Sequence, residues 1–204
     1  MYKSHLIFIK ILLCWVLVLG NNTVNAAVVY TYTGNNYIDI NPETRLGIYD
    51  SSMNLSISFT TDNLITNFNG DITALVSGFS SFDGVNLTTE GNADYYYFAI
   101  HTDSAGNVLE WDINVYVDVN FDEVGDRSFG VRSQYIIGRD GFDFVHTDEC
   151  LIYTLGNCYS IEDYYGRVFN NPGDWTVVPI PPALWLFGSG LLGLVGISRC
   201  KKST

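Results

Sequence analysis

The region between residues 27 and 176 contains no lysine, although it holds all 22 acidic residues of the chain. Its basic side chains are five arginines, namely Arg45, Arg127, Arg132, Arg139 and Arg167. The resulting net charge of −17 (22 acids against 5 arginines) would repel a phosphate-rich partner, which argues against nucleic-acid binding. Such a surface favours cations or neutral polymers. The alternative is that the charge only keeps an exported protein soluble.

The same region lacks the residue patterns of common catalytic sites. Its only histidines are His101 and His146, and neither lies beside a Gly-x-Ser-x-Gly motif that would indicate a nucleophilic triad. Phosphate-binding loops are absent, and nothing singles out two of the 22 acids as a glycosidase pair. We therefore predict that the protein is not an enzyme and that both histidines are ordinary sheet or loop residues.

No segment of this region has a convincing helical period, and alanine and leucine are sparse in it. Residues instead alternate between apolar and polar in Val28–Thr33, Leu55–Phe59 and Trp111–Phe121. In the third segment the apolar face comprises Trp111, Ile113, Val115, Val117, Val119 and Phe121. The opposite face is mostly polar, which predicts a strand with one buried side.

Further strands are predicted where β-branched and aromatic residues lie between turn signals. These segments are Ile72–Val76, Tyr95–Ile100, Phe129–Ile137 and Tyr164–Phe169. The loop Asp103–Asn107 between Tyr95–Ile100 and Val108–Val119 indicates a β-hairpin. The spacing of these strands predicts an all-β, antiparallel β-sandwich-like single domain over residues 27–176.

Two of the four cysteines, Cys150 and Cys158, lie in this region. In an exported protein such a pair is expected to form a disulfide. A zinc site would need more ligands than two thiols and the distant His101 and His146. The bridge would close a short loop and contribute on the order of 2–3 kcal/mol to stability.

Residues 1–26 have the three zones of a secretory signal peptide. Lys3 and Lys10 supply positive charge, Ile11–Gly20 is apolar, and Val24–Ala26 offers small residues before a cut after Ala26. The alternative is an uncleaved anchor, but the apolar stretch is short for a membrane span. The sequence therefore predicts an exported protein.

The other end, residues 177–204, predicts a transmembrane helix at about 183–198, because Ala183–Ile197 is free of charge. Pro179, Pro181 and Pro182 place the start of the helix near Pro182. Three basic residues follow it: Arg199, Lys201 and Lys202. By the positive-inside rule these stay cytoplasmic, with the body outside the inner membrane.

This tail resembles the PEP-CTERM sorting domain in its Val-Pro-Leu-Pro-Ala variant. The recognition motif corresponds to Val178, Pro179, Ile180 and Pro181, and the membrane stop to Arg199, Lys201 and Lys202. Ile180 replaces the glutamate of the name-giving motif, Pro182 stands where the variant often has alanine, and Cys200 interrupts the basic run. The resemblance implies that an exosortase, a membrane-embedded transpeptidase, cuts the tail, and that the body passes from the periplasm to the cell surface or medium. The alternative is a permanent single-span anchor.

The body resembles a group of uncharacterised PEP-CTERM proteins. The matching segments are Tyr30–Asn36, then Thr102, Asp103, Gly106 and Trp111, then Asn171–Trp175. This resemblance implies no activity. Because such proteins often come from makers of exopolysaccharide, an extracellular polysaccharide is the partner that it suggests.

Two groups of residues, one acidic and one aromatic, are candidate binding sites. Oxygen ligands at Asp118, Asn120, Asp122 and Asp126 resemble the first half of a calcium loop, but the turn glycine, Gly125, comes at position eight instead of six, and Phe129 stands where an EF-hand has its final glutamate. The alternative is a set of exposed acids running into a turn. Tyr95–Tyr97 and Tyr164–Tyr165 must place some rings outward, where they could stack on sugars or pack across strands. The sequence thus predicts a non-catalytic surface or matrix protein, or alternatively a carbohydrate-binding or calcium-dependent module. Calcium is the only cofactor it suggests.

Overall fold

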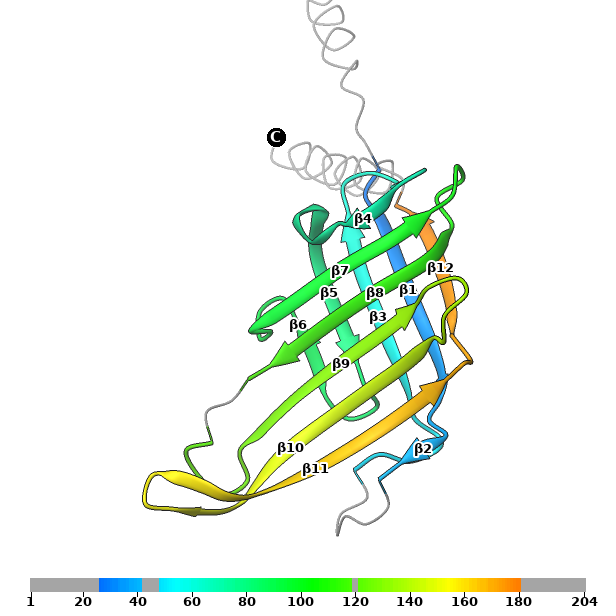
Figure 1. Cartoon of the computed structure of the whole chain (residues 1–204). Coiled ribbons are helices and arrows are strands. Elements are labelled where there is room, and N and C mark those ends of the chain that lie inside the picture. The colour runs from blue at the N-terminus through cyan, green and yellow to red at the C-terminus, as the bar shows by residue number, and fades with distance from the viewer. Residues whose placement is uncertain (1–25, 42–47, 119–120, 181–204) are drawn as a thin grey trace, which may run out of the picture. The chain divides into compact units, whose positions relative to one another are not determined.

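The computed structural model describes residues 26–41, 48–118 and 121–180. These residues form two antiparallel sheets that pack face to face as a β-sandwich (Figure 1). Residues 1–25 of the predicted signal peptide, Asn120, Pro181 and the transmembrane segment lie outside the described residues. So do the three basic residues Arg199, Lys201 and Lys202. Ala26–Pro181 forms one compact unit, so the predicted all-β body is confirmed.

One sheet has five strands in the order β12-β1-β3-β5-β6. Their bounds are β12 (Asp174–Pro179), β1 (Val28–Asn36), β3 (Asn54–Thr61), β5 (Val76–Phe82) and β6 (Leu87–Thr89). The first and last strands of the chain are therefore hydrogen-bonded neighbours, and Val28 pairs with Pro179.

The second sheet has seven strands in the order β2-β11-β10-β9-β8-β7-β4. Their bounds are β2 (Asp39–Ile40), β11 (Asn157–Phe169), β10 (Phe142–Thr154), β9 (Arg127–Tyr135), β8 (Val108–Val117), β7 (Tyr95–Thr102) and β4 (Asn69–Asp71). The middle strands follow one another as hairpins, and β7 and β8 form the hairpin predicted from the sequence.

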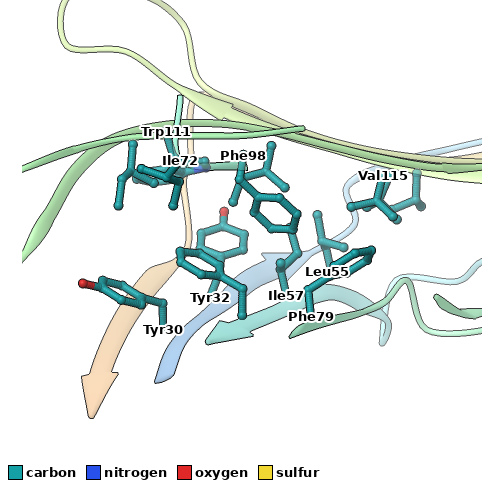
Figure 2. Close-up of a cluster of buried hydrophobic side chains, with 14 of the residues drawn as sticks. Tyr30, Tyr32, Leu55, Ile57, Ile72, Phe79, Phe98, Trp111 and Val115 are labelled. Carbon is teal, nitrogen blue, oxygen red and sulfur yellow. The ribbon is translucent and has the colours of Figure 1, made fainter. Parts of the chain in front are cut away.

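The core lies between the sheets and is rich in aromatic rings. Figure 2 shows Tyr30 and Tyr32 of β1 and Phe79 of β5 in this layer below Phe98 of β7 and Trp111 of β8. The ring of Tyr32 contacts that of Trp111, and the ring of Phe79 contacts that of Phe98. The alternation of β1, β3 and β8 puts every second side chain into this layer, because successive strand residues point to opposite faces. The rings make close pairs across the layer, such as Phe59 with Phe98 at 5.2 Å between centroids.

Several strand boundaries differ from the prediction. Ile72–Val76 was predicted as a strand, but Thr73–Leu75 is a 3-10 helix, which begins where the Asp71 carboxylate accepts the Thr73 N–H. The strand β8 ends at Val117 instead of Phe121. Sequence reasoning missed β10, found only the first residue of β5, Val76, and found only the second half of β11.

No helix among the described residues has the length and apolar character needed to span a membrane. The strand β12 continues past residue 176, so Val177, Val178 and Pro179 of the expected tail pair with β1. Proline is tolerated there because β12 is an edge strand.

Candidate functional site

The outer face of the seven-stranded sheet carries a row of rings that crosses five strands. Tyr95 of β7 pairs with Tyr116 of β8, and the register continues through Gly130 of β9 and His146 of β10 to Tyr165 of β11. We call Tyr95, Tyr116, His146 and Tyr165, with the adjacent Phe144, the aromatic row. All five side chains are partly or largely exposed.

Gly130 makes the centre of this row possible. A Cβ atom at that position would lie 2.6 Å from Tyr116 Cδ2 and 2.9 Å from His146 Cε1. The two rings therefore lean over the glycine and stack on each other at 5.7 Å between centroids with an interplanar angle of 23°. His146 also stacks on Phe144 at 5.4 Å and 16°. Three rings thus lie nearly parallel across the middle strands.

Two of the five arginines of the body extend the row. The Arg167 guanidinium lies 3.8 Å from the ring centre of Tyr165 and 4.9 Å from that of Phe144. Arg132 lies 5.5 Å from the ring centre of Phe142 and 3.5 Å from the Asp112 carboxylate. The guanidinium groups add hydrogen-bond donors to a surface that is otherwise apolar and acidic.

A shallow hollow of about 420 Å³ opens on this face. Its lining side chains include Tyr95, Asn114, Tyr116, Arg132, Phe144 and His146. Burial and the carboxylates of Asp71 and Asp112 raise the pKa of the neighbouring Tyr97, so its hydroxyl stays a neutral donor. Flat rings beside an amide and a guanidinium can stack on the C–H faces of a sugar and hydrogen-bond its hydroxyl groups.

The tyrosines singled out in the sequence divide between the two faces. Tyr95, Tyr97 and Tyr165 point outward, whereas Tyr96 and Tyr164 face the interior. Sequence reasoning missed Phe144 and Tyr116 as members of the same surface and treated His146 as an ordinary residue. The alternation of Phe142, Phe144 and His146 was the signal that could have located them.

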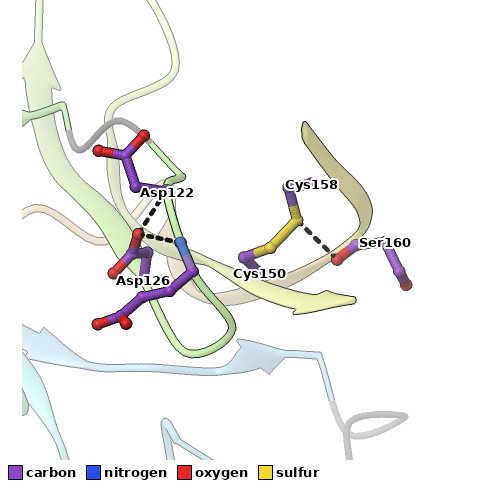
Figure 3. The surroundings of a disulfide bond; sticks show 6 residues. Asp122, Asp126, Cys150, Cys158 and Ser160 are labelled. Carbon is purple, nitrogen blue, oxygen red and sulfur yellow. Dashed lines mark hydrogen bonds between the residues drawn. A yellow bond between two sulfur atoms is a disulfide. The ribbon is translucent and has the colours of Figure 1, made fainter. Parts of the chain in front are cut away.

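The four expected calcium ligands are only partly described. Asp126 accepts the backbone N–H groups of Asp122 and Glu123 at 2.6 and 2.9 Å, and so closes a turn (Figure 3). The Asp118 N–H donates to Asp94. No group of three acidic, histidine or cysteine side chains within the described ranges, which leave out Asn120, could hold a metal ion. Calcium binding stays a prediction.

The predicted disulfide between Cys150 and Cys158 is confirmed, with the two Cα atoms 5.9 Å apart (Figure 3). It joins β10 to β11 close to the turn between them. The Cys150 backbone also exchanges hydrogen bonds with the loop before β9, because its N–H donates to Asp126 and its carbonyl accepts from Gly125.

The expected sorting motif begins in the edge strand β12. Val178 and Pro179 pair with Val29 and Val28, and the Ile180 N–H donates to the Ala27 carbonyl at 2.7 Å. Pro181 is outside the described residues. The two predicted processing points, after Ala26 and at Val178–Pro181, thus involve hydrogen-bonded neighbouring segments.

The three segments on which the body resemblance rests meet in the core. Tyr32, Trp111 and Trp175, one from each segment, lie within 5.2–5.8 Å of one another between ring centroids. The Gly173 N–H donates to the Tyr32 hydroxyl at 2.8 Å. A side chain at Gly173 would collide with the Thr33 carbonyl oxygen. These residues are therefore explained by packing between the sheets.

A buried carboxylate completes that cluster. Asp143 of β10 accepts hydrogen bonds from the Tyr32 hydroxyl at 2.9 and 3.0 Å and from the Ser133 hydroxyl at 2.6 Å. Ser133 in turn accepts the Trp111 indole N–H at 2.7 Å. Burial raises the pKa of Asp143 to about 6 in spite of these donors. The network joins both sheets through one ionisable group.

Comparisons with protein-family models, with curated proteins and with solved structures gave no match for this chain.

Proposed function

We propose that this chain is a non-catalytic exported protein of the cell surface or extracellular matrix whose aromatic row binds a neutral extracellular polysaccharide. The observation that supports this proposal is the row itself, in which parallel rings of Tyr116, His146 and Phe144 lie on the outer sheet face. Aromatic rings that gather on an exposed face, instead of lying there singly, favour a binding surface.

The charge distribution favours a neutral ligand. The body has a net charge of −17, from 22 acids against 5 arginines, which opposes polyanions at long range. Arg132 and Arg167 lie near Asp112 and Asp39, at 3.5 and 3.9 Å, so their charges are partly compensated. Stacking on rings and hydrogen bonds to sugar hydroxyls require no charge on the polymer.

The delivery route is proposed from the two ends. The signal peptide at residues 1–26 would send the body across the inner membrane. The tail at residues 177–204 would hold it there until an exosortase-type transpeptidase cuts near Val178–Pro181. Fractionation with mass mapping tests this step: a mature protein that keeps Trp185 and Lys202 in cells with the sorting enzyme would be a permanent anchor.

Binding is tested by affinity electrophoresis and titration calorimetry of the exported body against neutral polysaccharides. We expect Tyr116→Ala and Phe144→Ala each to weaken binding at least about tenfold, since each removes a stacking ring. Tyr159→Ala is the matched control, because Tyr159 is an exposed tyrosine outside the row. Equal affinity for all variants, or a preference for polyanions, would overturn the proposal.

The calcium alternative is tested on the same protein. Titration with calcium alone measures whether the body binds the metal. Glycan binding measured with and without a chelator then distinguishes a metal-dependent module from a metal-independent one. If calcium binds, Asp118→Ala and Asp122→Ala should abolish the binding heat. If no heat appears for the unmodified body, the calcium prediction is wrong.

A further inference from the structure

The hairpin of β10 and β11 extends beyond the sandwich. The strand β9 accompanies β10 only as far as the pair Arg127 and Glu149, and β2 pairs with β11 only at Gly166 and Arg167. From Cys150 to Ile161 the described ladder consists of these two strands alone. Figure 1 shows the hairpin projecting at the end of the body remote from the start of β1 and the end of β12.

The surface of this hairpin tip, residues 150–161, differs from the rest of the body. Its twelve residues include no charged side chain, in a region whose net charge is −17. The exposed fractions are 91% for Leu155, 65% for Tyr159 and 53% for both Ile152 and Ile161. From Leu151, at 39% exposure, to Asn157 every residue except Tyr153 is exposed, so neither face of the ribbon is fully covered.

The turn at the tip is unfavourable for folding. Leu155 and Gly156 both have positive φ, at 53° and 83°, as the central residues of a two-residue hairpin loop require when the turn is type I′. Asparagine, aspartate or glycine is preferred at the first position, and a leucine there is strained. Leu155 is thus disfavoured by its backbone conformation and by its exposure, and folding does not explain it.

We propose that the hairpin tip inserts into the interface of a lipid bilayer of low surface charge. Apolar side chains on all sides of a ribbon suit an apolar medium that surrounds them, whereas a protein groove needs only one apolar face. Tyr153 and Tyr159 have the amphipathic rings that occupy membrane interfaces. Glu162 and Asp163 at its base oppose anionic lipids, whereas the charge of the nearby Glu149 is paired with Arg127 at 3.0 Å.

The disulfide fits this role because it keeps the two strands paired where no third strand supports them. A second copy is a poorer partner, since two bodies of the same negative charge would repel each other. The inference does not depend on glycan binding, because the aromatic row lies on the sheet and includes none of residues 150–161.

The test uses residues 27–180, which contain every described strand and nearly all of one compact unit. The probe is phosphatidylcholine vesicles, with phosphatidylglycerol vesicles as the anionic comparison. Leu155→Trp should show blue-shifted emission with the neutral vesicles and quenching by brominated lipid. We expect Ile152→Asp with Leu155→Asp to weaken flotation with vesicles at least about tenfold.

Two controls distinguish insertion from misfolding. Ile137→Asp changes an equally exposed apolar residue elsewhere, at 61% exposure, and should leave flotation unchanged. Leu155→Asn should weaken flotation while making the fold no less stable, because asparagine suits positive φ. Flotation that is absent, or unaffected by the tip variants, would overturn the proposal. Binding of the tip to a protein without vesicle binding would overturn it too.

Discussion

Each strand of the seven-stranded sheet places side chains on two faces, and the two faces have different roles. In β8, Trp111 and Val115 point to the core, while Asn114 and Tyr116 point outward. The inner indole of Trp111 donates to Ser133 and is almost fully buried. The outer ring of Tyr116 leans over Gly130 against His146 and stays partly exposed. Aromatic residues of one strand, such as Trp111 and Tyr116 five positions apart, thus serve either folding or a proposed surface contact.

This difference has an energetic side. Replacing an inner ring leaves a cavity between two sheets that cannot close fully, and it removes the buried hydrogen bonds of that ring. Replacing an outer ring removes less packing contact, because part of that ring is already in contact with water. The comparison therefore predicts that inner substitutions change stability and outer substitutions change binding.

The largest effect is expected for Trp111→Ala. The substitution removes a ring that contacts Tyr32, Trp175 and Tyr135, and leaves the Ser133 hydroxyl without its indole donor. We expect the free energy of unfolding to fall by about 3–5 kcal/mol, measured by urea denaturation. A loss below about 1 kcal/mol, similar to that of an outer residue, would contradict the distinction between the faces.

The next effect is a pH dependence that arises from Asp143. Its folded pKa is about 6 against an ordinary value of 3.8, so the folded state binds the proton more tightly than the unfolded state. This contribution is full below about pH 4 and is lost as pH rises through 6. Asp143→Asn stays neutral, and its stability relative to the unmodified protein should rise by about 3 kcal/mol between pH 4 and pH 7. Urea denaturation at several pH values measures it, and a constant difference would contradict it.

The alternation of apolar and polar residues was enough to predict the strands in which it is regular. The segments around Val28, Leu55 and Trp111 have apolar residues at every second position, and these became β1, β3 and β8. The strand β10 was missed because Asp143, Thr147 and Glu149 interrupt its inward face. Asp143 is acceptable there because Tyr32, 111 residues earlier, and Ser133 of β9 donate to it, and contacts between strands leave no local signal.

The candidate site was predictable only in part for the same reason. Tyr95 and Tyr165 were expected to include outward rings, since adjacent strand tyrosines cannot all face inward. The row also needs the register that aligns Gly130 with Tyr116 and His146. Register depends on pairing between strands. The disulfide was predictable because export leaves a cysteine pair few other roles.

The hairpin tip sharpens the comparison, because only its base is covered: Cys150 is buried, and its backbone is hydrogen-bonded to the loop before β9. Most side chains from Leu151 to Asn157 are exposed, so the bond between Cys150 and Cys158 should supply much of the stability of the tip. Replacing both cysteines by serine should cost on the order of 2–3 kcal/mol, and hydrogen exchange should show faster opening of amides 150–161. The amides of β8 serve as the internal control. Uniform acceleration across the body would mean that the bond supports the whole sandwich.

The smallest stability effect is expected at Tyr95, the outermost ring of the aromatic row, which is 52% exposed. Tyr95→Ala should change the free energy of unfolding by no more than about 0.5 kcal/mol, as exposed substitutions usually do. Its glycan affinity should nevertheless fall, because the ring lines the hollow above Gly130. Phe98→Ala, three residues along the same strand but buried, is the matched inner variant and should lose about 3–5 kcal/mol. If Tyr95→Ala loses stability like Phe98→Ala and keeps full glycan affinity, the outer rings serve the fold, and the two faces do not differ in the way proposed.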